Sequence, residues 1–191
     1  MLQSTGKQKA GKNKAIDMVS LGPIYRYASK NPLRLLPEVF IVIVMLSYLT
    51  VASGLTNYGL FYTDAATVEP ILKVGIVFAT WMGLILMAEL VCRIGLNASK
   101  NHLSLTVNTA LSMTPYIIFL ALYTALNQLT PLPDPLNSPL TLTGLIATHV
   151  WFLLAFTRGV QYAKKVARSY AAMIGLASYY INVIMLLLII L

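Results

Sequence analysis

The ionisable side chains inside apolar stretches are the residues of this sequence most able to do chemistry. Glu89 and Arg93 lie four residues apart, so a helix would place both on one face, where carboxylate and guanidinium can pair. Arg34 and Glu38 repeat this spacing earlier in the chain. An acid inside a membrane span is a functional candidate. Because each acid has a cation one helical turn away, the spacing favours structural ion pairs over a proton relay.

A histidine inside an apolar stretch is the next candidate. His149 could ligate a haem or carry protons. The other histidine, His102, is expected in a loop at a different depth, so we do not expect a pair of axial haem ligands from one chain. The sequence therefore favours a hydrogen-bonded packing role for His149.

Residue sets for catalysis or metal binding are not evident. The six acids, two histidines and single cysteine, Cys92, are scattered along the chain, whereas a nucleophile needs a base and an orienting group within reach. One cysteine excludes an internal disulfide and a multi-cysteine metal site, and no hydrolase elbow, phosphate loop or zinc helix occurs. We expect no catalytic residues, no metal, no cofactor and no small-molecule substrate, and so no enzyme.

The elements that must position these residues are long apolar helices. Hydrophobic residues make up 58% of the 191 residues and charged residues 10%, against about 25% charged in soluble domains. Several apolar runs reach the length of about twenty residues that crosses a bilayer, and backbone groups in lipid must be satisfied within a helix. The sequence predicts an all-α membrane protein, a bundle of five transmembrane helices. The expected spans are 36–56, 70–92, 104–127, 141–160 and 170–191.

The distribution of cations predicts the orientation of these spans. With five spans, every Lys and Arg except Lys73 falls on one side, while the opposite loops, 57–69 and 128–140, carry the acids Asp64, Glu69 and Asp134. Lys and Arg are enriched in cytoplasmic loops. We therefore expect the N-terminus in the cytoplasm and the C-terminus outside.

Three regions follow from this division. Residues 1–15 are polar and basic, and we expect a disordered tail. Residues 16–35 mix apolar and basic residues, which is typical of an interfacial segment, with a solvated linker as the alternative; Pro23 after Gly22 could open a short helix there. Residues 36–191 form the transmembrane domain. The glycosylation sequence Asn97-Ala98-Ser99 falls on the cytoplasmic side, and we expect it to be unmodified.

Four cations form a basic elbow between the fourth and fifth spans: Arg158, Lys164, Lys165 and Arg168. Such cations can meet anionic lipid headgroups, at about 1 kcal/mol each. This orienting role is the favoured interpretation, and a specific lipid or protein site is the alternative. Nucleic acid is not an expected partner, because no aromatic and basic surface of useful size lies outside the membrane.

Small residues four apart predict where helices pack closely. Gly75, Ala79 and Gly83 form a helix-packing groove in the second span, for internal packing or, as the alternative, a partner helix. Two shorter pairs repeat the spacing: Ala171 with Gly175, and Ala121 with Ala125.

Polar residues and a proline inside the spans give further expectations. Pro115 should kink the third span, because proline removes a backbone hydrogen bond. Asn108 and Asn182 can form hydrogen bonds between helices.

Three stretches resemble the Yip1 family of membrane proteins: NPLRLLPEVFIVIV at the first span, RIGLNASKNHLSLTVNTALSMTP at the third, and HVWFLLAFTRGVQYAKKVARSYAA across the elbow. The resemblance that they carry extends over most of residues 30–191. The Asp-Leu-Tyr-Gly-Pro signature of eukaryotic members is absent, so the likeness is closer to prokaryotic members. The resemblance implies a five-span domain and a non-enzymatic, membrane-organising or trafficking-type role.

Three functions are consistent with these features. The first is a Yip1-like adaptor or scaffold that contacts lipid and either another membrane protein or a second copy. The second is a small accessory subunit of a larger respiratory or translocating complex. The third, a transporter or channel, is least favoured, because no polar stripe through the mid-bilayer and no paired broken spans are evident. In each case we expect an integral membrane protein, in the cell membrane if the source is prokaryotic.

Overall fold

The computed structural model describes residues 21–58, 61–64, 69–95, 101–129 and 138–190. Expectations for the tail 1–15 and for Asn97-Ala98-Ser99 lie outside these residues. The elements run in this order: α2 (Gly22–Lys30), the 3-10 turn η1 (Pro32–Leu35), α3 (Leu36–Ser53), β1 (Leu55–Tyr58), β2 (Phe61–Asp64), α4 (Pro70–Gly95), α5 (His102–Ser112), α6 (Thr114–Leu129), α7 (Pro139–Lys164) and α8 (Arg168–Ile190).

Five membrane-spanning segments are confirmed. The described part of the chain contains five helical segments long and apolar enough to cross a bilayer, with α5 and α6 together forming one of them. The ends of these segments differ by a few residues from the predicted spans. The helices also expose many large apolar side chains, such as Phe40, Ile71 and Leu188. Such a surface is suited to lipid, because exposed apolar patches of this extent are rare on soluble monomers.

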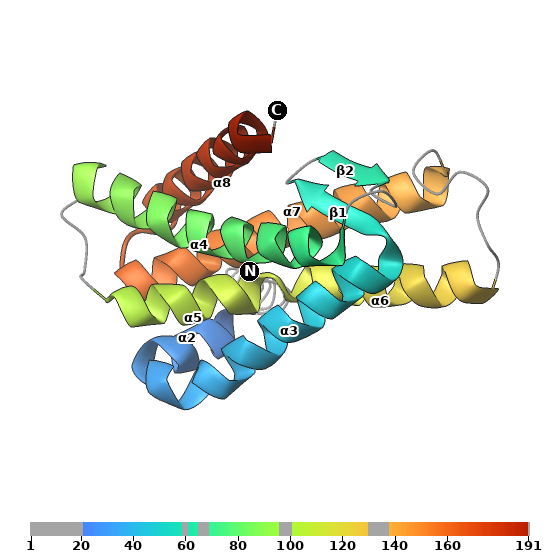
Figure 1. Ribbon diagram of the computed structural model, residues 1–191. Coiled ribbons are helices and arrows are strands. Elements are labelled where there is room, and N and C mark those ends of the chain that lie inside the picture. Colours follow the sequence, from blue (N-terminus) through green and yellow to red (C-terminus); the bar gives the residue numbers. More distant parts are fainter. Residues whose placement is uncertain (1–20, 59–60, 65–68, 96–100, 130–137, 191) are drawn as a thin grey trace, which may run out of the picture.

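Apart from the last turn of α8, which lies at the top of the view, the helix ends divide between the two ends of the bundle as the predicted topology requires (Figure 1). The last turns of α4 and α7 and the first turns of α3, α5 and α8 lie at the left of the view, with α2 beside α5. The last turns of α3 and α6 and the first turns of α4 and α7 lie at the right. Which end faces the cytoplasm remains a prediction from the cations.

The break predicted at Pro115 is confirmed. Helix α5 ends at Ser112 and α6 begins at Thr114, so Pro115 lies in the first turn of α6. Proline has no N–H to donate. The side-chain hydroxyl of Thr114 instead donates to the carbonyl of Leu111 at 2.7 Å. The break therefore leaves this carbonyl with a hydrogen bond within the span.

A short antiparallel hairpin occupies part of the segment predicted as a loop. Strands β1 and β2 pair Leu55 with Asp64 and Tyr58 with Phe61. Gly54 ends α3 with a φ of 72°, a left-handed conformation that glycine adopts readily. Leu55 is buried, and β1 contacts α3, α4 and α8. The Thr, Tyr and Phe residues of both strands have high β propensity.

Candidate functional site: a charge cluster and a mid-bundle polar layer

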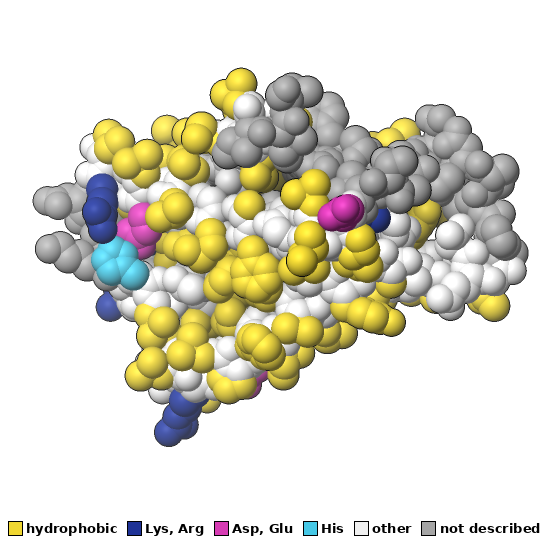
Figure 2. Space-filling model, viewed as in Figure 1, with side chains coloured by type: hydrophobic (Ala, Val, Ile, Leu, Met, Phe, Trp, Pro, Cys, Tyr) yellow, Lys and Arg dark blue, Asp and Glu magenta, His cyan; other side chains and the backbone are white. Residues whose placement is uncertain are grey.

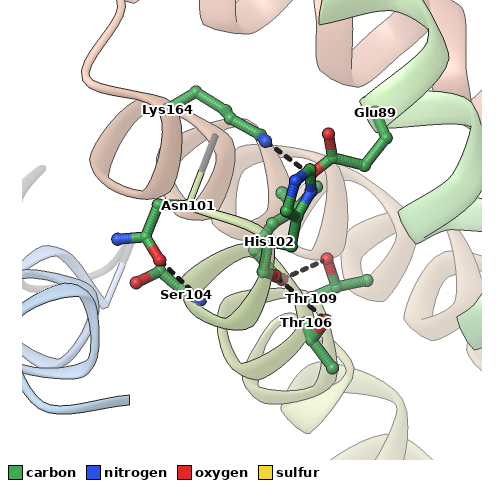
Figure 3. A network of polar contacts seen from close by, with 8 residues as sticks. Glu89, Asn101, His102, Ser104, Thr106, Thr109 and Lys164 are labelled. Carbon is green, nitrogen blue, oxygen red and sulfur yellow. Dashed lines mark hydrogen bonds and ion pairs between the residues drawn. The ribbon is translucent and has the colours of Figure 1, made fainter. Parts of the chain in front are cut away.

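The structure joins three ionisable side chains that lie far apart in the sequence, here called the charge cluster: Glu89 of α4, His102 of α5 and Lys164 of α7 (Figure 3). The Lys164 ammonium donates to Oε1 of Glu89. His102 Nδ1 lies 2.9 Å from the same oxygen. Figure 2 shows a histidine surface beside an acidic surface near the left end of the bundle. The cluster therefore ties three helices together through one carboxylate.

Local structure fixes the backbone around the cluster. The Asn101 side chain accepts a hydrogen bond from the Ser104 backbone N–H at 3.3 Å and so caps α5, whose first residue is His102. The Thr106 hydroxyl donates to the His102 carbonyl at 3.0 Å. Helix α7 ends at Lys164, because Lys165 adopts a left-handed φ of 55°.

The three side chains of the charge cluster differ in solvent exposure, and this difference indicates the role of each one. The Lys164 side chain is 1% exposed and that of Glu89 13%, whereas that of His102 is 51% exposed. A buried ammonium is tolerated when a carboxylate pairs with it, and removing one partner of such a pair is strongly destabilising. The Lys164–Glu89 pair therefore has a structural role in joining α4 to α7, and His102 links it to solvent.

The partner of Glu89 differs from the one expected. Arg93, one turn away on α4, is exposed, and Glu89 pairs instead with side chains from two other helices. Between Arg34 and Glu38, both described and exposed, the structure shows no ion pair. An exposed cation gains little from a neighbouring acid in water, whereas a buried one requires it.

The basic elbow is divided between interior and surface. Lys165 and Arg168 are exposed, as a surface that meets lipid headgroups requires. Arg158 is half-buried and donates to Gln161 at 2.7 Å. Lys164 is buried in the charge cluster, so the expectation that it faces lipid is corrected.

A second polar group, here called the mid-bundle layer, lies near the middle of the spans: Tyr116, His149, Tyr179 and Asn182. The Tyr116 hydroxyl lies 3.1 Å from His149 Nδ1, and that of Tyr179 lies 3.4 Å from the same nitrogen. His149 is thus hydrogen-bonded, as predicted, and its Nε2 is buried with no partner in the structure. The ring of Phe152 packs against the rings of Tyr116 and Tyr179, with distances between ring centroids of 5.0 and 5.7 Å.

The mid-bundle layer continues to α4 through Asn182. The Asn182 amide donates to the carbonyl of Thr80 at 3.3 Å, which confirms the predicted bond between helices. A Cβ atom on Gly83 would overlap the Asn182 side chain, so glycine is what allows α8 this close to α4. Polar side chains from three spans, together with a backbone carbonyl of α4, therefore lie at mid-depth. These residues share one depth, so the expectation that no polar stripe runs through the mid-bilayer stays a prediction.

The predicted helix-packing groove is only partly a helix contact. Gly83 packs against α8, but Ala79 and Gly75 are exposed, and nothing lies within 4 Å of a Cβ placed on Gly75. In α8 the prediction is more accurate: Ala171 is buried, and a Cβ on Gly175 would lie 2.6 Å from the Thr157 side chain of α7.

The corresponding pair in the third span faces outward. Ala121 and Ala125 are both exposed on α6. Their four-residue spacing therefore does not mark a helix contact within the chain.

Helix α2 is held by a row of buried polar contacts, here called the seam, that was not predicted from the sequence. Tyr25, fully buried, bonds through its hydroxyl to that of Ser112 at 3.0 Å. The Asn108 amide donates to the Ser29 hydroxyl at 3.1 Å and to the Gly159 carbonyl at 2.9 Å. The latter confirms the predicted interhelical role of Asn108. Burial raises the pKa of Tyr25 well above its usual range. The four-residue spacing along α5 was the signal that could have revealed this seam.

Among the described residues, no group of three or more His, Cys, Asp or Glu side chains could hold a metal ion. Cys92 is buried and free. No protein-family model matches the chain, and neither a curated protein nor a solved structure is similar enough to match it.

Proposed function

We propose that this integral membrane protein is a non-enzymatic adaptor or scaffold, as its resemblance to the Yip1 family implies. The observation that carries the proposal is that the Glu89 carboxylate is occupied by contacts with two other helices. This carboxylate, the acid most suited to chemistry in the bundle, accepts from both Lys164 and His102. An acid committed to a buried ammonium and an imidazole joins helices rather than exchanging protons with a substrate. For a prokaryotic source, we propose the cell membrane as its location.

Polar groups elsewhere in the interior support the same interpretation. Asn108 and Asn182 bond to the backbones of neighbouring helices. Interhelical hydrogen bonds of this kind are a general means of holding helices together in lipid, where the hydrophobic effect between helices is absent. A bundle stabilised in this way presents apolar surfaces on which other membrane proteins can dock.

Substitution of both ends of the buried pair tests this function. A scaffold requires a folded bundle, but it does not require the Glu89 carboxylate for any chemical step. The double variant Glu89→Leu with Lys164→Leu should therefore retain the wild-type pattern of cross-linked species in intact cells, because apolar replacement of a buried pair is often tolerated. The matched control, Glu89→Leu alone, leaves Lys164 unpaired and should lose the pattern together with the fold. A well-folded double variant that loses the pattern would contradict the proposal.

A second candidate function is an accessory subunit of a larger membrane complex. The exposed Gly75 and Ala79 on α4 favour it, because small residues four apart let a helix from another chain approach closely. Purification in mild detergent separates the two candidates. The adaptor should be a monomer or homodimer. A stable stoichiometric complex with redox or transport subunits would support the second function, and Gly75→Leu should then dissociate it.

A further inference from the structure

Helix α5 carries a polar ridge toward α2. Ser104, Asn108 and Ser112 are spaced four residues apart, and all three are fully buried. Beside them, α7 contributes the carbonyl of Gly159, and the Asn108 Cβ and the Ser112 hydroxyl would each lie 3.2 Å from a Cβ built there. These four residues are here called the α2-binding face. Polar ridges are used in membranes to bind helices.

Helix α2 matches this face with two residues four apart. Tyr25 bonds to Ser112, and Ser29 bonds through its hydroxyl to Asn108. The Ser104 hydroxyl donates to the Ser29 carbonyl at 3.3 Å. Rising residue numbers in α2 meet falling numbers in α5, so the two helices run antiparallel. The face therefore recognises hydroxyl groups at a four-residue spacing.

The match leaves one acceptor unused. Asn108 is fully buried, and its side-chain Oδ1 has no hydrogen-bond partner. A buried acceptor without a donor is costly, the more so in a medium of low dielectric constant. Helix α2 therefore satisfies the hydrogen-bonding groups of the face only in part.

Outside this face, α2 is held by buried Ala28 and by α7, where Arg26 donates to the Tyr162 hydroxyl at 3.3 Å and its guanidinium lies 5.6 Å from the centre of the Tyr162 ring. The helix has nine residues, fewer than an isolated helix needs for stability in water. It is joined to α3 through Asn31 and η1, and no residue of η1 is buried. Displacing α2 would therefore break its contacts with α5 and α7 without disturbing a buried connection.

We propose that the α2-binding face is a receptor for a transmembrane helix of another membrane protein that carries two hydroxyl side chains four residues apart. Helix α2 occupies the face until such a helix displaces it. Lipid tails cannot replace α2, because they offer no partner to Ser104, Asn108 and Ser112. This inference rests on the proposed adaptor function and names the chemistry of its partner.

The first experiment measures whether α2 leaves the face. In a full-length Cys92→Ala background, Ser112→Cys would be alkylated by a membrane-permeant maleimide only when Tyr25 moves away. Tyr25→Ala should raise the alkylation rate by more than about tenfold, and Tyr25→Phe by about threefold, the effect of one interhelical hydrogen bond. The matched control is Ala110→Cys, buried elsewhere on α5, whose rate should not change. Equal rates with and without Tyr25→Ala would overturn the displacement.

The second experiment tests the partner chemistry in liposomes. The probe is a leucine-rich transmembrane peptide with tyrosine and serine four residues apart, and its control has phenylalanine and alanine there. The hydroxyl peptide should slow alkylation of Ser112→Cys in the Tyr25→Ala protein at least about threefold, while the control peptide does not. Equal protection by both peptides, or by neither, would overturn the proposal. Protection that depends on protein concentration alone would identify a second copy as the occupant and also overturn it.

These results are separable from the adaptor function. The function fails if the folded double variant at Glu89 and Lys164 loses its cross-linked species, whatever the peptides do. The receptor proposal fails on the peptide comparison, even where other surfaces carry the partners.

Discussion

The charge cluster and the mid-bundle layer both place polar side chains inside a membrane bundle, but they stabilise them in different ways. At the end of the bundle, Glu89 and Lys164 are charged groups, and His102 links them to solvent with half its side chain exposed. Near the middle, His149 bonds to tyrosine hydroxyls that carry no charge. The cost of an ionised group in a bilayer rises with depth. The comparison teaches that this bundle places charges where one partner reaches water and uses neutral hydrogen bonds elsewhere.

The largest expected effect comes from breaking the ion pair. Glu89→Gln leaves the buried Lys164 ammonium without a counter-charge, and we expect the free energy of unfolding to fall by about 3–5 kcal/mol. Denaturation in detergent measures it. Arg93→Gln is the matched control, one turn away and exposed, and should change little. If Arg93→Gln costs as much as Glu89→Gln, then Arg93 and not Lys164 is the partner.

Overpacking the mid-bundle layer should have the next largest effect. Gly83→Leu forces a side chain into Asn182 of α8, and we expect a loss of about 1–3 kcal/mol. Gly75→Leu, on the same face of α4 but with open space around it, should leave the thermal melting in detergent unchanged. Equal melting of the two variants would mean that α8 does not cross α4 at Gly83.

Removing the buried histidine should cost less. His149→Phe retains a ring but removes the hydrogen bonds of His149 Nδ1 with Tyr116 and Tyr179, and we expect a loss of about 0.6–1.7 kcal/mol, the range of single bonds between membrane helices. Val150→Phe, exposed on the next position of α7, provides the control in the same melting assay. A loss as large as that of Glu89→Gln would show that His149 carries a charge, against the comparison drawn here.

The smallest effect is expected at the exposed member of the charge cluster. His102→Gln removes a partner of Glu89 that is half in solvent, and exposed ion pairs contribute about 0.2–1 kcal/mol. Because salt screens exposed charges, the loss should shrink as ionic strength rises in the same denaturation assay. A salt-independent loss of several kcal/mol would place His102 in the interior with Lys164.

The sequence predicted correctly those features that depend on a single helical segment. Apolar length identified the five spans, and Pro115 located the break in the third, because both depend on local properties of the chain. The partners of Glu89 were missed for the converse reason. Spacing on α4 pointed to Arg93, whereas Lys164 reaches the acid only because α4 and α7 both pack against α5 and α8. Likewise, the spacing of Gly75, Ala79 and Gly83 could not show that α8 crosses at Gly83 alone.

The sequence did not predict the β1–β2 hairpin or the α2-binding face, because both depend on tertiary contacts. Residues 55–64 are too few to give a distinct strand pattern beside long apolar helices. The ridge of Ser104, Asn108 and Ser112 was visible in the sequence, but its occupant was not. Only the fold brings Tyr25 and Ser29 alongside it.

A double-mutant cycle between Glu89 and Lys164 tests the central claim most directly. The claim is that the intramembrane acid is committed to a buried ammonium on another helix. Free energies of unfolding would be measured for the wild type, Glu89→Leu, Lys164→Leu and the double variant. We predict a coupling energy of more than about 2 kcal/mol, with the double variant more stable than either single one. Additive losses, with a coupling near zero, would contradict the account.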